Sequence, residues 1–148
     1  MYKHILVATD GSKLSRKAIR AAAGLASAVG AKLTAIYVIP PFAPPMYSEA
    51  MLYAPPMSQA KYRDLAKRAG QKALAVAQIE AQTARVAYDA ALLAAPDPWE
   101  GIVRTAKTKK CDLIVMASHG RRGLAGLLLG SETAKVLTHS KVPVLVCR

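Results

Sequence analysis

Short apolar runs alternate with segments of helical periodicity along the whole chain, and this alternation constrains the fold more than any other feature. The clearest runs are HILVAT (4–9), LTAIYVI (33–39), DLIVMA (112–117) and VPVLVC (142–147). Such β-branched and aliphatic runs are typical of strands that are buried on both faces. With a weaker run over 85–93, they predict an α/β fold, with an open five-stranded parallel sheet and helices on both faces.

The segments between these runs have the start and stop signals of helices. Apolar residues recur every three or four positions from Lys13 until Gly30, which is expected to end a first helix. Ser58 is expected to cap a long second helix, and a fourth helix is expected over 131–140. Asp97-Pro98 predicts the start of the third, because Asp caps, Pro suits the first helical position, and Glu100 can reach back to the cap.

The connection between the second strand and the second helix is rich in proline. Six prolines break any regular element there, at positions 40, 41, 44, 45, 55 and 56. A connection of this length inside a compact domain is expected to be functional or mobile.

The length of 148 residues indicates one domain, over 1–148. The apolar runs are too short to span a bilayer, and the first residues lack the features of a secretory signal, so we expect a cytoplasmic protein without membrane association. Cys111 and Cys147 lie far apart without Cys-x-x-Cys spacing, which favours neither a zinc site nor a redox motif.

The net charge of +12 favours anionic partners, which include nucleotides, nucleic acids and acidic proteins. Many of the basic residues fall on predicted helices, where a solvated polar face is the plainer interpretation. No motif of interleaved aromatic and basic residues accompanies the charge, so nucleic acid is the less favoured partner.

Right-handed crossovers place all strand-to-helix turns of such a sheet on one edge. Ligands bind there, outside the carboxyl ends of the strands, at the point where the strand order reverses. The turns Asp10-Gly11-Ser12 and Ser118-His119-Gly120 are the predicted walls of that crevice.

The second of these turns opens a glycine-rich stretch, ASHGRRGLAGLLLGSET (117–133). Its glycines allow left-handed or close-approach backbone and stand at positions 120, 123, 126 and 130. Gly130-Ser131 directly precedes a predicted helix, so free N–H groups, the positive helix end and the Ser131 hydroxyl favour a phosphate there. The spacing matches neither the P-loop nor the dinucleotide-binding pattern, which excludes a Walker-type ATPase and a Rossmann dehydrogenase.

This stretch resembles the ATP-binding branch of the universal stress protein family, whose signature is Gly-x-x-Gly, nine residues, then Gly-Ser/Thr. Gly120, the nine residues 121–129 and Gly130-Ser131 match it, with Ala117 at the first glycine. Asp10-Gly11-Ser12, Asp97-Pro98, DLIVMASHG and VPVLV also fall in the family order, so the resemblance covers nearly the whole chain. It implies a Rossmann-like fold of the adenine nucleotide alpha hydrolase type.

The resemblance further implies ATP, with Mg²⁺, at the carboxyl ends of the first and fourth strands. Asp10 would contact the ribose or a metal-bridged phosphate, the Val38 backbone would contact adenine, and Met116 would pack near the base or sugar. The candidate nucleotide contacts are Ala8, Thr9, Asp10, Val38, Met116, Ala117, His119, Gly120, Gly130, Ser131, Glu132 and Thr133. The family also implies a homodimer that pairs through the last strand, Val142 to Cys147.

Three functions stay open from the residues. The first is a regulatory protein in which ATP changes the order of the proline-rich and glycine-rich loops. The second is a slow ATPase, although no base that orients water can be assigned. The third is an interaction protein that recruits an acidic partner or nucleic acid through its basic surface. Individual residues have plainer interpretations too: Asp10 as a turn former, Met116 as core, and Arg121 and Arg122 as solvated charges.

Overall fold

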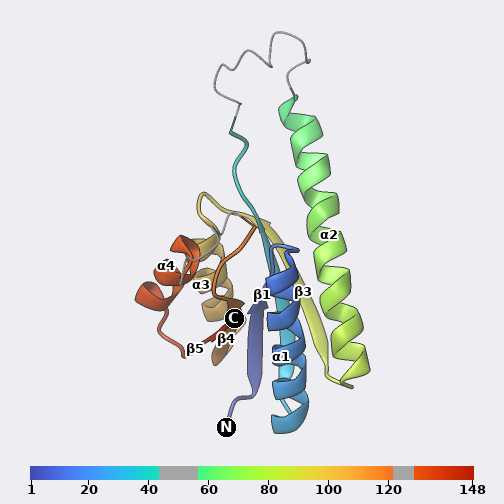
Figure 1. The fold of residues 1–148 in the computed structure, drawn as a ribbon, viewed down its shortest axis with the longest axis vertical. Coiled ribbons are helices and arrows are strands. Elements are labelled where there is room, and N and C mark those ends of the chain that lie inside the picture. Colours follow the sequence, from blue (N-terminus) through green and yellow to red (C-terminus); the bar gives the residue numbers. More distant parts are fainter. Residues whose placement is uncertain (44–56, 122–128) are drawn as a thin grey trace.

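Five parallel strands form the central sheet in the order β3-β2-β1-β4-β5, and helices cover both of its faces (Figure 1). The computed structural model describes residues 1–43, 57–121 and 129–148. The strands are β1 (His4–Ala8), β2 (Lys32–Ile39), β3 (Tyr88–Ala94), β4 (Leu113–Ala117) and β5 (Val144–Cys147). The helices are α1 (Lys13–Val29), α2 (Gln59–Thr83), α3 (Pro98–Thr108) and α4 (Ser131–His139). The predicted α/β fold with a five-stranded parallel sheet is confirmed.

The sheet separates two apolar cores, one on each face. In β1, Ile5 and Val7 pack into the core under α1 and α2, whereas Leu6 and Ala8 pack into the core under α3 and α4. Successive strand residues point to opposite faces, so a strand covered on both sides has no polar face. This burial explains why β1 and β4 read as continuous apolar runs.

Small residues allow the helices to approach the sheet closely. The buried face of α1 is made largely of alanine, at positions 18, 22, 23 and 26. On α2, a Cβ added at Gly70 would lie 2.5 Å from Leu92 Cδ1 and 2.8 Å from Tyr37 Cδ1. At Gly70, therefore, α2 lies directly against β2 and β3.

The amino-terminal half of α2 extends beyond the sheet that its other half covers (Figure 1). The Tyr62 hydroxyl donates a hydrogen bond of 2.8 Å to the Pro40 carbonyl, and the rings of Tyr62 and Phe42 lie 5.2 Å apart. These contacts join the overhanging part of α2 to the residues that follow β2.

The strand order reverses between β1 and β4, which places the predicted crevice at their carboxyl ends. At the amino ends of the same two strands, the Asp112 carboxylate accepts hydrogen bonds from the Lys3 and His4 N–H groups, at 2.8 and 3.0 Å. These bonds therefore hold β1 and β4 together at the edge of the sheet away from the crevice.

Two strands, β3 and β5, begin at least two residues later than the sequence predicted, and β4 begins one residue later. β3 starts at Tyr88 and not at Arg85, because Arg85 has a φ of 56° and the following N–H, of Val86, is bonded to Ala81 O at the end of α2. β5 starts at Val144 and not at Val142, because the Ser140 hydroxyl bonds both the N–H and the C=O of Val142.

Part of the predicted loop structure lies outside the described residues. This holds for Gly123, Gly126 and positions 44–56 of the proline-rich connection. Among the helices of the described ranges, none combines the length and the apolar character that crossing a bilayer requires.

Candidate functional site

The turn after β1 is fixed by its own hydrogen bonds. Gly11 has a φ of +79°, a conformation that strains residues with a side chain. The Asp10 carboxylate accepts the Ser12 N–H at 2.9 Å, and the Thr9 hydroxyl accepts the Gly11 N–H at 3.1 Å. Ser12 then caps α1 by accepting the Ser15 N–H. The chain therefore reverses sharply and holds Asp10 at the edge of the sheet.

The structure brings this turn together with the one that follows β4. The second oxygen of the Asp10 carboxylate accepts the Arg121 N–H at 2.7 Å. A Cβ added at Gly120 would lie 2.5 Å from that same oxygen. Gly120 is therefore needed for this close approach, and not for a left-handed backbone.

Hydrogen bonds determine the charge state of Asp10. Burial alone would raise the pKa of this carboxyl, but the bonds donated by Ser12 and by the Arg121 N–H outweigh burial and lower the pKa below its ordinary value of 3.8. Asp10 is therefore a carboxylate at neutral pH.

Replacing Asp10 with asparagine is expected to lower the free energy of unfolding at neutral pH by about 1–3 kcal/mol, because a neutral amide oxygen accepts these bonds more weakly. The pKa is lower in the folded state than in the unfolded chain. The stabilisation is therefore complete above the unfolded pKa and is lost as pH falls through the folded pKa. The difference between wild type and Asp10→Asn, measured by urea unfolding, should shrink below about pH 4. A difference that stays constant to about pH 3 would contradict this assignment.

Free amides stand at the start of α4, opposite the Asp10 turn. The Gly130 N–H is bonded to Ser118 O at 2.6 Å, and the first helical bond runs from Ala134 N–H to Gly130 O. Gly130 is the N-cap residue and supplies no side-chain cap. Among the residues that the structure describes, the N–H groups of 131–133 thus have no hydrogen-bond acceptor. We call these three N–H groups the amide cradle.

Gly130 holds the amide cradle close to the turn after β4. A Cβ at Gly130 would lie 3.1 Å from His119 Cα and 3.3 Å from Ser118 O. Since Arg121 of that turn is bonded to Asp10, both predicted walls and the amide cradle share one edge of the sheet. Three N–H groups at the positive end of a helix are suited to bind phosphate oxygens.

The side chains of Glu132 and Thr133 are directed away from the amide cradle, so only their backbone remains as a candidate contact. Glu132 Oε2 accepts the Trp99 N–H at 2.9 Å at the start of α3, and the Thr133 hydroxyl donates to Ala117 O at 2.9 Å. The predicted capping of α3 by the Asp97 side chain is wrong, because Asp97 makes no side-chain cap bond. Glu132 supplies an acceptor from a neighbouring helix instead.

Val38 presents backbone groups at the end of β2. The β1–β2 ladder ends at the Ala8–Ile36 pair, after which Thr9 N–H is bonded to Ile36 O. Peptide groups alternate in direction along a strand, so those of Val38 point to the same side as those of Ile36, beyond the end of β1. They can therefore reach a ligand in the crevice.

The remaining candidates lie at the end of the sheet. Ala8 and Met116 belong to the core under α3 and α4. Ala117, at the first signature glycine, is buried and paired with Cys147 in the β4–β5 ladder, so the strand accommodates its methyl group. His119 is half-buried, with Nδ1 3.2 Å from the Ser118 hydroxyl. Within the described ranges, no group of three or more His, Cys, Asp or Glu could hold a metal ion.

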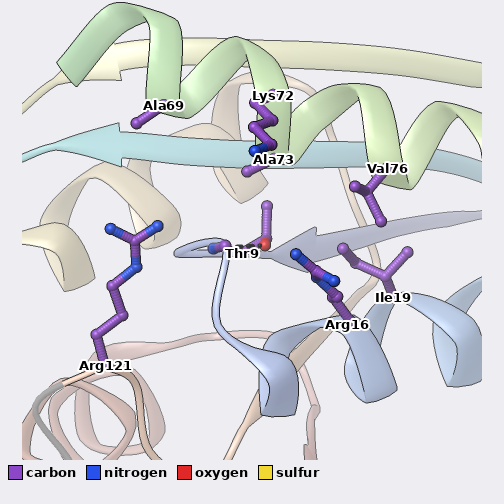
Figure 2. A pocket seen from close by; sticks show the side chains of 9 residues that line it. Thr9, Arg16, Ile19, Ala69, Lys72, Ala73, Val76 and Arg121 are labelled. Atoms are coloured by element: carbon purple, nitrogen blue, oxygen red, sulfur yellow. Dashed lines mark hydrogen bonds between the residues drawn. The ribbon is translucent and has the colours of Figure 1, made fainter. Parts of the chain in front are cut away.

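Sequence reasoning missed a cavity of about 280 Å³ on the other side of the Asp10 turn, between α1 and α2. Arg16, Lys72 and Arg121 surround it (Figure 2). The spacing of these residues in the sequence does not indicate a site, because they come from three separate parts of the chain. Only the position of Arg16, in the first turn after Ser12, could have indicated the cavity.

Known proteins resemble this chain over its full length, both in sequence and in structure. The sequence model of the universal stress protein family matches residues 1–148. A universal stress protein of Methanocaldococcus jannaschii is 34% identical over 148 residues, which are 100% of this chain and 83% of the relative. The structure of UspA from Lactobacillus plantarum has a TM-score of 0.79 at 26% identity, covering 99% of this chain and 98% of that one. A universal stress protein solved in complex with cAMP has a TM-score of 0.67 at 28% identity, covering 99% and 97%.

Proposed function

Because this chain belongs to the universal stress protein family, we propose that it is an ATP-binding regulatory protein of the stress response, with the nucleotide at the carboxyl ends of β1 and β4. The observation that carries this proposal is the amide cradle on the same edge as the Asp10 carboxylate. The relative in complex with cAMP supports an adenine nucleotide as the ligand.

In this proposal the amide cradle binds the phosphates. Its three N–H groups and the positive end of α4 favour anionic oxygens, and the exposed Ser131 hydroxyl adds a donor. The net charge of +12 raises the local concentration of anionic ligands. Gly130 has no side chain that would compete for the N–H groups.

The adenosine would lie towards β2. The N–H and C=O of Val38 offer one donor and one acceptor, which is the pattern that an adenine edge requires.

The Asp10 carboxylate, ionised at neutral pH, would accept a hydrogen bond from a ribose hydroxyl or bind Mg²⁺. Each of its oxygens already accepts one N–H and keeps a further lone pair. Mg²⁺ commonly uses one or two carboxylates together with phosphates and water, so the ATP phosphates would complete its coordination.

A binding role fits Asp10 better than a catalytic one. A general base works best when its pKa is close to the working pH, and hydrogen bonds lower that of Asp10 instead. Asp10 is therefore a weak base and a permanent negative charge. We propose nucleotide-dependent regulation, with hydrolysis at most slow.

The edge strand β5 is the proposed contact in a homodimer. It lies at one side of the sheet, and Leu145 on it is 42% exposed. An unpaired edge of this kind can pair with the same strand of a second copy. A monomer in sedimentation at micromolar concentration would rule this contact out.

Thermal unfolding with and without Mg-ATP tests the nucleotide site. ATP at about a hundred times its Kd should add roughly 2.7 kcal/mol to the free energy of unfolding. The melting temperature of a domain of this size should then rise by about 5–10 °C. No shift at millimolar ATP would reject the proposal in favour of an interaction protein.

The variant Ser131→Asp separates the amide cradle from other sites. Ser131 is exposed at the first position of α4, where a carboxylate favours the helix but repels phosphate. We expect this variant to fold and to lose most of the ATP-induced shift. Gln59→Asp, at the first position of α2, is the matched control and should keep the full shift. An equal shift in Ser131→Asp would place the phosphates elsewhere.

A further inference from the structure

The cavity between α1 and α2 has one charged side and one apolar side. Arg16 enters it from α1, Lys72 from α2, and Arg121 from the residues after β4, around Thr9 at the end of β1 (Figure 2). The apolar wall consists of Ile19, Ala69, Ala73 and Val76. Three cations from separate parts of the chain thus share a volume of about 280 Å³.

Within the described part of the chain, none of these three exposed cations forms an ion pair. The carboxylates there that form ion pairs, within 4.0 Å, use other partners: Glu80 pairs with Arg20, Asp64 with Arg68, Asp89 with Lys32 and Lys109, and both Asp97 and Glu132 with Lys135. Asp10, on the turn beside the cavity, accepts backbone N–H groups of Ser12 and Arg121. The repulsion among the cations would be relieved by an anion from solution.

The Arg121 guanidinium lies against the turn that follows β1. A Cβ added at Gly11 would lie only 2.7 Å from the Nη2 of Arg121 and 3.6 Å from the Ala73 methyl group. The guanidinium therefore occupies the space that a side chain at position 11 would fill, between the turn and α2. The planar guanidinium fork is preorganised, so it loses little conformational entropy for each hydrogen bond that it forms with a ligand.

We propose that this cavity is a second anion site, which binds a small phosphorylated molecule. Two guanidinium groups can each donate paired hydrogen bonds to phosphate oxygens, and the Lys72 ammonium adds a point charge. The opposite wall is apolar and accepts the carbon skeleton of a phosphate ester. The volume restricts the ligand to a compact molecule.

The cavity and the nucleotide crevice meet at Arg121. Its backbone N–H is bonded to Asp10 of the crevice, whereas its guanidinium lines the cavity. The phosphoryl group in the cavity can come from a separate molecule or from the tail of the nucleotide itself. The geometry favours a separate molecule, because the amide cradle offers the nucleotide phosphates a site of their own.

Inorganic pyrophosphate is the probe, titrated by calorimetry into the Ser131→Asp variant, whose amide cradle is blocked. Saturable binding is expected at about 0.15 M salt. In this background Arg16→Gln and Lys72→Gln should each weaken binding about tenfold, the loss expected for one charge-assisted contact. Lys17→Gln and Lys67→Gln are the matched controls, because these exposed lysines lie on the same two helices but do not line the cavity. They should weaken binding less than about twofold, through the lost net charge alone.

Each result of the pyrophosphate titrations either supports the second anion site or overturns it. Absence of saturable binding at millimolar pyrophosphate, or equal weakening by the control variants, would overturn the site. Pyrophosphate binding to wild type that is saturated with Mg-ATP supports a separate molecule. Loss of binding there, while Ser131→Asp still binds, would assign the cavity to the nucleotide's own phosphates and overturn the second site. A failed nucleotide proposal is recognised separately, by the absence of a thermal shift with Mg-ATP.

Discussion

Replacing Gly120 with alanine is expected to weaken ATP binding about ten- to hundredfold, which corresponds to the roughly 1.5–3 kcal/mol of a hydrogen bond to a charged group. The added methyl group would lie 2.5 Å from the Asp10 carboxylate oxygen that accepts the Arg121 N–H. The φ of Gly120 is outside the left-handed region, so backbone strain contributes nothing. The methyl group must instead displace either Asp10 or the turn after β4. Isothermal titration calorimetry with Mg-ATP measures the loss.

Gly24→Ala is the matched control for this prediction. A Cβ at Gly24, in the middle of α1, would meet no atom within 4 Å. This substitution should raise the free energy of unfolding by about 0.5–1 kcal/mol, because alanine favours helix more than glycine does. It should leave the Kd of ATP unchanged. If Gly120→Ala bound ATP as tightly as Gly24→Ala, the contact between the two turns would not contribute to the nucleotide site.

Replacing Leu6 with alanine is expected to lower the free energy of unfolding by about 2–5 kcal/mol. Leu6 is 0% exposed on the central strand β1, where its side chain fills the core under α3 and α4. The rigid strands and helices around it can close such a cavity only in part. Urea unfolding followed by circular dichroism measures the effect.

Leu65→Ala provides the comparison for Leu6. Leu65 lies in the amino-terminal half of α2 and is 47% exposed, so its replacement should change the stability by no more than about 0.5 kcal/mol. Similar losses in the two variants would mean that burial on β1 is not what stabilises the sheet.

The sequence was sufficient to predict the centre of the sheet because β1, β4 and most of β2 are buried on both faces. A run such as Leu113–Ala117 has no polar position, and few structures other than a covered parallel strand explain it. Strand boundaries were harder to predict. The late start of β5 depends on the Ser140 hydroxyl, which bonds Val142 locally, and hydroxyl groups of this kind leave no periodic signal.

Within the candidate site, residues on turns were predictable and contacts between distant side chains were not. Asp10, Gly120 and Gly130 follow from the chemistry of turns and helix starts, which is local in sequence. The acceptor that Glu132 provides to Trp99 depends on how α4 packs against α3. The convergence of Arg16, Lys72 and Arg121 likewise requires α1 and α2 to lie side by side, which no spacing in the sequence encodes.

The overhang of α2 makes the position of its first turns sensitive to the tilt of the helix. The helix packs against β2 and β3 at Gly70, and its overhanging turns extend about 16 Å from there to Gln59. A tilt of about 10° around Gly70 would therefore move Gln59 by roughly 3 Å. Since the Tyr62 hydroxyl on this part of α2 is bonded to Pro40, two residues beyond Val38, a displacement of the end of β2 would be passed directly to the overhanging turns.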